Sequence, residues 1–254
     1  MIYLFFIFIL GLIIGSFIGA YTYRWPRGIS IAKGRSFCPK CKKKISWYDN
    51  IPLFSYLLLS GKCRNCKKNV SPRYPLIELS TALLFVAVYT LKGTTLQGGI
   101  VIPYLLAITS ALIIIFIIDL EHKLIPDEPV FFILSLSLIN LILSSSDKFY
   151  AILFTAFLAA LFILFLNFIT KGRGMGLGDV KLVLALGLSF YDWKILLIWL
   201  FGSFIIGAVV GVFLIAIGKA RFGKQIPLGP FIILSFFIAM FWGNPLANYL
   251  FPYL

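Results

Sequence analysis

Long apolar runs separated by short polar stretches make up most of this 254-residue chain. A helix needs about 20 apolar residues to cross the hydrocarbon of a bilayer, and most of the runs approach that length. They lie at 2–23, 76–91, 99–119, 129–145, 150–170, 180–191, 195–218 and 226–250. The pattern therefore predicts an all-α polytopic membrane protein with about eight transmembrane helices.

The run at 180–191 is the shortest of the eight. At ~1.5 Å per residue it reaches only about 18 Å, whereas the hydrocarbon is ~30 Å thick. The residues that break the chain near it are Pro126, Pro129, Gly172, Gly174, Gly176 and Gly178. Irregular backbone at that depth is tolerated where protein covers it or where it lines a wet cavity. We expect either a short helix beside a thinned or water-filled region, or a re-entrant segment.

Composition supports this class, because 61% of the residues are hydrophobic and only 13% are charged, a low charged share for a soluble domain. The net charge of +14 is concentrated in one loop, since residues 24–73 hold thirteen Lys and Arg and a single acid, Asp49. A basic stretch confined to one loop follows the positive-inside rule and attracts anionic lipid. We therefore expect anionic membrane lipid as a partner, and no nucleic acid.

The distribution of charge also predicts an orientation. No basic residue precedes the first run and many follow it, which is the reverse of a cleaved secretory signal. We expect a retained helix with its N-terminus outside. Alternating sides from there places 20 of the 23 Lys and Arg in cytoplasmic loops and leaves Lys92, Lys148 and Lys194 outside, as the positive-inside rule requires.

All four cysteines lie in the basic loop as two CxxC pairs, Cys38 with Cys41 and Cys63 with Cys66. Paired CxxC turns at this separation are typical of tetrahedral zinc, and thiols that face a reducing cytoplasm rarely form disulfides. The alternative is a redox or incidental cysteine set. Four thiolates leave no open metal position, so we expect structural zinc that helps to fold a loop with little core of its own.

These features divide the chain into three parts. Residues 1–23 form the first transmembrane helix, 24–75 a small cytoplasmic zinc-ribbon-like insert between helices 1 and 2, and 76–254 a transmembrane core. Glycines recur every four residues in the first helix and allow close approach of another helix, at Gly11, Gly15 and Gly19. We find no convincing internal repeat.

Two acids stand at the ends of apolar runs. Asp119 closes the run at 99–119, and Asp179 precedes the run at 180–191. An intramembrane carboxylate is costly and marks a functional site by default, and the predicted topology puts both on the cytoplasmic side. Two carboxylates that meet predict shared-proton acid–base chemistry. The alternatives are a helix N-cap for Asp179 and a headgroup-level charge for Asp119.

Other polar residues carry weaker signals. Gly176 and Gly178 would let a substrate backbone come close. Lys181 either lowers the pKa of a nearby acid or extends its amine toward water, and Asp127 is typical of a solvated turn. Glu78, at the start of the second run, either contacts a ligand or pairs with a nearby arginine. The sequence contains no Ser/His/Asp or Cys/His set and no phosphate-binding loop.

The ordered set of motifs resembles the prepilin peptidase family, the bifunctional type IV leader peptidases and N-methyltransferases of bacterial inner membranes. The matching residues are Gly15-Ser16-Phe17, Arg24-Trp25-Pro26, the two CxxC pairs, Arg73-Tyr74-Pro75 with Glu78, Asp119-Leu120-Glu121, Ile125-Pro126-Asp127, Gly176-Leu177-Gly178-Asp179 with Lys181, and Ile226-Pro227-Leu228-Gly229-Pro230. The GxGD element alone is shared with other intramembrane aspartyl proteases, whereas the ordered set is specific.

The resemblance implies that Asp119 and Asp179 form a catalytic pair. With water, the pair would cut the short basic leader of prepilins and pseudopilins at the cytoplasmic face of the bacterial inner membrane. The residues expected to support this site are Gly176, Gly178, Lys181 and Asp127. The resemblance also implies N-methylation of the new N-terminal residue with S-adenosylmethionine, for which we select Arg73 and Glu78 as binding residues.

Two other classes of function are compatible with the residues. A membrane transporter with a cytoplasmic zinc module would use the aspartates as a proton or cation relay, although such transporters often contain two related halves. A non-catalytic pilus assembly platform would tolerate loss of both aspartates.

Overall fold

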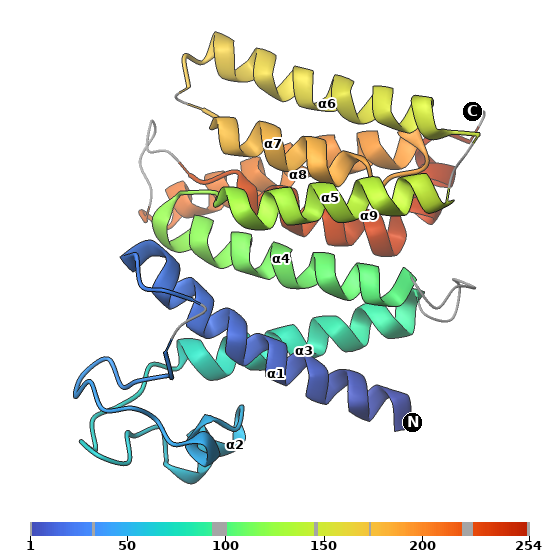
Figure 1. Ribbon diagram of the computed structural model, residues 1–254. Coiled ribbons are helices and arrows are strands. Elements are labelled where there is room, and N and C mark those ends of the chain that lie inside the picture. Colours follow the sequence, from blue (N-terminus) through green and yellow to red (C-terminus); the bar gives the residue numbers. More distant parts are fainter. Residues whose placement is uncertain are drawn as a thin grey trace. The chain divides into compact units, whose positions relative to one another are not determined.

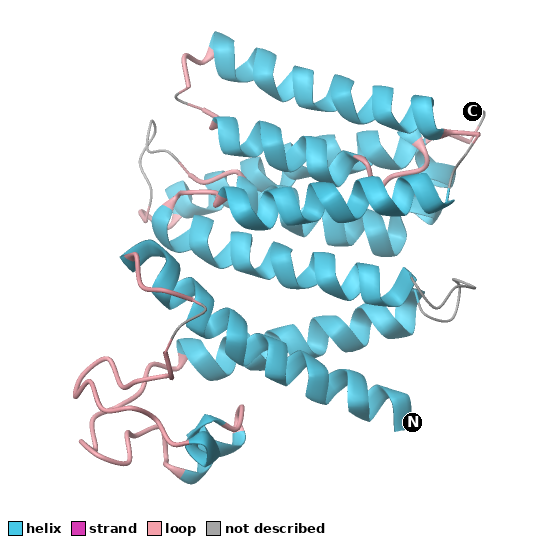
Figure 2. Ribbon diagram, in the orientation of Figure 1, coloured by secondary structure: helices cyan, strands magenta, loops and turns pink. Residues whose placement is uncertain are grey.

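The structure is a computed structural model that describes residues 2–31, 34–92, 101–144, 147–172, 174–219 and 226–252. Regular secondary structure in these ranges is helical (Figure 2), which confirms the all-α prediction. The elements are α1 (Ile2–Arg24), η1 (Trp25–Arg27), η2 (Trp47–Asn50), α2 (Phe54–Leu58), α3 (Arg73–Lys92), α4 (Val101–His122), α5 (Asp127–Ser144), α6 (Phe149–Ile169), α7 (Leu177–Gly187), α8 (Trp193–Ala216) and α9 (Gly229–Leu250).

In the described ranges, seven helices are long and apolar enough to cross a membrane: α1 with its η1 extension, α3, α4, α5, α6, α8 and α9. The predicted run at 180–191 corresponds to α7, a helix of 11 residues that spans about 16 Å at ~1.5 Å per residue. Of the two forms expected for this segment, the structure therefore contains the short helix. The chain is a multi-pass membrane protein.

The packing of the chain changes inside α4. The contacts define two compact units, Met1–Ile114 and Ile115–Leu254, and we describe each by itself. The predicted division into a first helix (1–23), a cysteine-containing insert (24–75) and a transmembrane core (76–254) stays a prediction.

In the first unit, α1 packs against α3, and the glycines of α1 make this approach possible. An added Cβ at Gly11 would lie 2.5 Å from Ala82 Cα, and one at Gly15 would lie 2.7 Å from Glu78 Cα. These distances are too short for any side chain, so the backbones of the two helices touch. Gly19 faces a side chain instead, which confirms the predicted close approach for the first two glycines.

In the second unit, the short helix α7 is enclosed by other helices. It packs against α5, α6 and α9, and Figure 1 shows α6 and α7 side by side. The side chains of Leu182, Val183 and Leu186 are fully buried. A helix too short to span the bilayer is thus covered by protein, as irregular backbone at membrane depth requires. This packing fixes the position of the residues at its N-terminus.

Candidate active site and metal centre

Asp119 lies in the last turn of α4 and is only 4% exposed. The helix ends just after it, because Lys123 adopts a positive φ of 56° while its amide donates to the Asp119 carbonyl at 2.8 Å. The carboxylate oxygen Oδ2 is buried and has no hydrogen-bond partner in the part of the chain that the structure describes. A buried acceptor without a partner is costly, so this oxygen is suited to a water molecule or a polar ligand.

Asp179 lies in the first turn of α7 and is 6% exposed. Its Oδ2 accepts the Gly176 amide at 2.8 Å, and its own amide donates to the Gly176 carbonyl. Gly176 is the N-cap residue and Asp179 is the third residue of the helix. The N-cap alternative for Asp179 is therefore wrong. The helix begins at Leu177 rather than at residue 180, so the N-cap position belongs to Gly176, three residues before Asp179. Asp179 stabilises the helix start from the third helical position, by accepting a hydrogen bond from the N-cap amide.

The two carboxyl groups line one open depression of about 390 Å³ in the second unit. Its walls come from the segments that follow α4, precede α7 and precede α9. The lining residues include Asp119, Lys123, Ile125, Asp127, Gly174, Gly176, Gly178, Asp179, Lys181, Ile226 and Leu228. The structure thus brings together acids that are sixty residues apart in the sequence.

Glycines allow the backbone to pack tightly around Asp119. Gly229, at the start of α9, lies so close that an added Cβ would collide with Asp119 Oδ2. At Gly178, an added Cβ would lie 2.9 Å from Ile125 Cβ. Gly229 lies in the motif Ile226-Pro227-Leu228-Gly229-Pro230, but no local signal indicates its contact with Asp119, because the two residues are more than one hundred positions apart. Gly176 has more room, because the nearest atom would be 3.7 Å away.

The other two predicted supporting residues contact each other. Lys181 Nζ lies 2.8 and 3.1 Å from the carboxylate oxygens of Asp127, and both side chains are about half exposed. The ion pair joins the fifth residue of α7 to the first residue of α5. An exposed pair of this kind contributes less than about 1 kcal/mol to stability.

The four cysteines of the first unit form a compact cluster. All four Sγ atoms lie within 4.8 Å of one another, and Cys38 Sγ is 3.9 Å from Cys66 Sγ. Zn–S distances of about 2.3 Å in a tetrahedron place sulfur atoms about 3.8 Å apart. The cluster therefore fits a zinc ion with four thiolate ligands.

The two CxxC turns are built alike, with equivalent residues 25 positions apart. Lys42 donates its amide to the Cys38 carbonyl at 2.8 Å, and Lys67 donates to Cys63 at 2.9 Å. Both lysines have positive φ, 61° and 57°. Two further pairs of amide-to-carbonyl bonds are equivalent. The Cys38 amide donates to Lys43 as the Cys63 amide donates to Lys68, and the Ile45 amide donates to Ser36 as the Val70 amide donates to Gly61. The expectation of no internal repeat is wrong for this segment, because residues 38–46 and 63–71 share both the pattern C-x-x-C-K-K-x-I/V-S and these backbone bonds.

The thiols of the cluster have unequal acidity. A hydrogen bond from the Cys66 amide, outweighing desolvation, lowers the pKa of Cys63 to about 7. For Cys41, a hydrogen bond from the Lys43 backbone lowers the pKa, but desolvation and the neighbouring thiols outweigh it and raise the pKa to about 11. A metal ion that binds all four thiols must displace the protons that remain on them.

The two residues selected for the methyl donor both lie in the first turns of α3. Glu78 is 8% exposed and accepts the Leu53 amide at 2.8 Å. Arg73 donates from its guanidinium to the Thr22 hydroxyl at 2.8 Å, so it joins α3 to α1. The pairing of Glu78 with a nearby arginine, left open by the sequence, stays a prediction.

Comparison with known proteins gives two matches to family profiles. Residues 9–91 match the bacterial peptidase A24 N-terminal domain, and residues 106–212 match the type IV leader peptidase family. No solved structure matches the chain.

Several curated relatives carry the name prepilin leader peptidase/N-methyltransferase. The Pseudomonas aeruginosa protein is 34% identical over 268 residues, which cover 94% of this chain and 90% of the relative. The Aeromonas hydrophila protein is 33% identical, with 96% and 92% covered. The Vibrio cholerae protein is 34% identical, with 94% and 97% covered.

A multi-pass helical fold with two buried aspartates in one depression is typical of a membrane-embedded aspartic peptidase, and the type IV leader peptidase match agrees with that class. At this identity and coverage, the chain belongs to the prepilin leader peptidase/N-methyltransferase family.

Proposed function

We propose that this protein cleaves the short basic leader of prepilins or pseudopilins, with Asp119 and Asp179 as the catalytic pair. The observation that carries the proposal is the placement of two buried carboxyl groups on one polar depression. The names of the relatives support the substrate class. They give no support to a transporter.

The pair has the groups that peptide hydrolysis by water requires. One carboxylate, ionised, takes a proton from a water molecule whose oxygen attacks the scissile carbonyl carbon. The other, protonated, donates a hydrogen bond to the carbonyl oxygen; as the C–N bond breaks, the leaving nitrogen takes a proton from the pair. Two like charges in one site disfavour double ionisation, which keeps one proton on the pair. The unpartnered Oδ2 of Asp119 offers a place for the water or the substrate.

The residues around the pair act by positioning it. The Gly176 amide holds one oxygen of Asp179, which leaves the other oxygen for chemistry. The absence of a side chain at Gly176, where an added Cβ would have no atom nearer than 3.7 Å, leaves room for a peptide backbone beside the start of α7. The predicted role of Gly178 in substrate approach is not supported, because Ile125 fills the space that its side chain would take. The ion pair between Lys181 and Asp127 joins α7 to α5.

We further propose that the N-terminus lies outside and that the cysteine cluster and both aspartates face the cytoplasm of a bacterium. The concentration of 20 of the 23 Lys and Arg in loops of one side supports this orientation, and it would also draw the basic loop to anionic lipid. A cytoplasmic pair fits a leader that is cut just outside the transmembrane helix of the substrate.

The cysteine cluster is proposed to hold structural zinc through Cys38, Cys41, Cys63 and Cys66. The sulfur spacing and the two matching turns support this assignment. The segment around the cluster buries few apolar side chains, with Cys38 the main one, so the metal would supply much of its folding free energy.

The second activity is methylation of the amine that cleavage exposes, as the names of the relatives suggest. S-adenosylmethionine would supply an electrophilic methyl group, and the amine would lose a proton as its nitrogen forms the new bond.

One experiment tests both activities. The purified chain, reconstituted in lipid, is incubated with a prepilin and the methyl donor, and the N-terminus of the product is read by mass spectrometry. A shortened product with an added methyl group supports the proposal. An intact precursor, from protein that is folded and loaded with zinc, would refute the peptidase assignment.

A further inference from the structure

Residues 47–58 of the cysteine segment expose several large apolar side chains. The stretch contains η2 and α2, which contact each other. Within α2, Phe54, Leu57 and Leu58 follow the i, i+3, i+4 spacing of one helix face and are 56%, 72% and 67% exposed. Exposed apolar groups that gather in this way mark an interaction surface. We define the apolar patch as Trp47, Ile51, Phe54, Leu57 and Leu58, all of them exposed.

The charges around the apolar patch suit a membrane surface. The only charged residue in the stretch 47–58 is Asp49, whose side chain is 10% exposed and accepts hydrogen bonds from Arg64. Exposed cations flank the stretch on both sides. They are Lys40, Lys42, Lys43, Lys44, Lys62, Arg64, Lys67 and Lys68. Aromatic and aliphatic groups between cations are typical of an element that lies in the interface of a bilayer.

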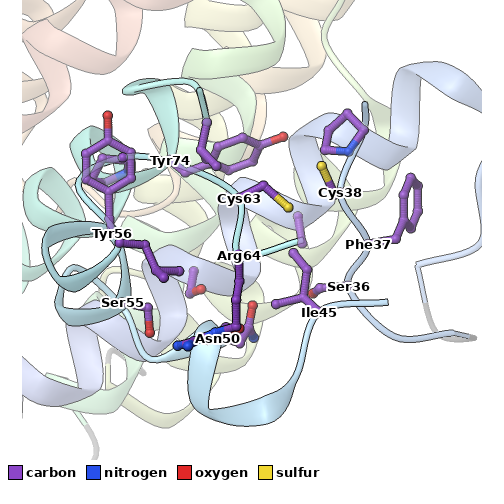
Figure 3. Close-up of a pocket in the computed structure, with 18 of the residues that line it drawn as sticks. Ser36, Phe37, Cys38, Ile45, Asn50, Ser55, Tyr56, Cys63, Arg64 and Tyr74 are labelled. Carbon is purple, nitrogen blue, oxygen red and sulfur yellow. The ribbon is translucent and has the colours of Figure 1, made fainter. Parts of the chain in front are cut away.

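The inner side of α2 is attached to the membrane-spanning helices of the first unit. The Leu53 amide, just before α2, donates to Glu78 of α3 at 2.8 Å. Ser55 and Tyr56 line a cavity (Figure 3) whose walls also include Ser16 of α1. Figure 1 shows α2 at the end of the unit where α1 stops and α3 begins. The exposed face of α2 is therefore the one that protein leaves uncovered.

The attachment lies inside the spanning segments rather than beyond their ends. Glu78 is five residues after the start of α3 at Arg73. Gly15, which lies against Glu78, is nine residues before the end of α1 at Arg24. At ~1.5 Å per residue these separations are about 8 and 14 Å. Interfacial elements bury their apolar side chains about 5–10 Å into the boundary between headgroups and acyl chains, so α2 is held at a depth where lipid surrounds the protein.

We propose that the apolar patch inserts into the membrane interface and anchors the cysteine segment to the bilayer. The partner is lipid, with acyl chains against the patch and anionic headgroups beside the flanking cations. In the turn of α3 that holds Glu78, Leu76 and Leu79 are also exposed, so the lipid-facing surface of a spanning helix extends to the level of the patch. The inference rests on the multi-pass fold and holds whether or not the chain is a peptidase.

Insertion differs from electrostatic attraction, because salt screens charges but not apolar contacts. The first test is quenching of Trp47 in the zinc-loaded full chain, reconstituted in vesicles of phosphatidylethanolamine and phosphatidylglycerol with brominated acyl chains. Subtraction of the emission of Trp47→Phe isolates Trp47 from the rest of the five tryptophans. We expect loss of the Trp47 emission, greater with bromine near the headgroup than at the chain end, and unchanged in roughly 1 M salt, where the Debye length is about 3 Å. An unquenched Trp47, or quenching that disappears in salt, would overturn the inference.

A second test identifies what touches α2. The photoreactive residue p-benzoylphenylalanine replaces Phe54, one aromatic side chain for another, and the matched control carries it at the exposed Asn65 in the second CxxC turn. Irradiation in native membranes should give phospholipid adducts at position 54 and far fewer at position 65. Crosslinks from position 54 to a second copy or to another protein in place of lipid would make the patch a protein interface and refute the anchor.

Removal of the apolar patch should release the segment from the bilayer. The triple variant Phe54→Ser, Leu57→Ser, Leu58→Ser should be cut by trypsin after Lys62 and Arg64 roughly tenfold faster or more in vesicles, since each apolar side chain contributes to docking and proteolysis follows the population of the open form. The matched control, Phe54→Leu, Leu57→Ile, Leu58→Ile, keeps the apolar surface and should be cut like the unaltered chain. Zinc content shows that both variants are folded, and equal cleavage of the two would contradict the inference.

Discussion

The cysteine cluster and the aspartate pair are assembled in opposite ways. The four thiols come from two short turns of the same design within a 29-residue stretch. The two carboxyl groups come from the ends of α4 and α7, and the start of α9 closes the site against Asp119. The cysteine site thus depends on local backbone geometry and a metal, whereas the aspartate site depends on how separate helices pack.

This difference predicts opposite responses to substitution. Removal of a thiol takes away folding free energy from a segment that has little else to hold it. Removal of a buried carboxylate charge relieves a desolvation cost, so the helices should stay packed while chemistry is lost.

The largest expected effect is on cleavage. Asp119→Asn and Asp179→Asn should each lower the rate of prepilin trimming by roughly 10³-fold or more, since acid–base groups contribute about 10²–10⁴-fold each. The melting temperature should not fall. Asp147→Asn, at an exposed aspartate outside the depression, is the matched control. Trimming of a prepilin at the unaltered rate by either active-site variant would contradict the catalytic assignment.

The next effect is on the metal. Cys38→Ser and its counterpart Cys63→Ser should each reduce zinc below one ion per chain and expose the basic segment to trypsin, because structural zinc supplies about 10–16 kcal/mol to small sites. Metal analysis and limited proteolysis measure this. The repeat predicts similar losses for the two variants. Full zinc content in both would argue against the tetrathiolate site.

A smaller effect should follow from crowding Asp119. Gly229→Ala places a methyl group against Asp119 Oδ2, and a displacement near 1 Å costs about 10²-fold in rate. We expect kcat to fall with little change in KM. Gly243→Ala, in the same helix, would instead crowd the apolar side chain of Ile195. It should lower stability by about 1–3 kcal/mol and spare kcat. Equal kcat values for the two variants would exclude a positioning role for Gly229.

The smallest effect concerns pH and zinc. In the metal-free protein at pH 8, Cys41, with a pKa of about 11, holds its proton, while Cys63, with a pKa of about 7, is mostly ionised. Zinc binding must displace the remaining thiol protons, so the apparent zinc affinity should fall as the pH drops from 8 to 6. Competition with a chelator at the two pH values measures it, and an affinity that does not change with pH would indicate other ligands.

Local sequence signals predicted the features that local geometry determines. The CxxC spacing was sufficient for the thiol cluster. The glycines at every fourth position of α1 indicated close approach to another helix, which the structure identifies as α3. The repeat of the two turns was missed although the sequence carries it, since residues 38–46 and 63–71 share the pattern C-x-x-C-K-K-x-I/V-S. The matching backbone bonds, from Ile45 to Ser36 and from Val70 to Gly61, make the repeat evident in the structure.

Contacts between distant segments were beyond the reach of sequence patterns. Nothing near Gly229 indicates that it lies against Asp119, and nothing near Lys181 identifies Asp127 as its partner. The apolar run predicts that α7 starts at residue 180, three residues too late. The helix starts earlier because the Gly176 amide donates a hydrogen bond to the Asp179 carboxylate. Helix packing determines these features, and periodicity does not reveal it.

The brevity of α7 has a consequence for how the second reactant arrives. Hydrolysis consumes water, which the hydrocarbon of a bilayer excludes. Eleven helical residues span roughly half of the ~30 Å hydrocarbon thickness. The irregular backbone before the helix must then find its hydrogen bonds in protein or in water. A short helix at this point of the chain therefore gives solvent a route to a peptide bond that a full-length helix would have sealed off.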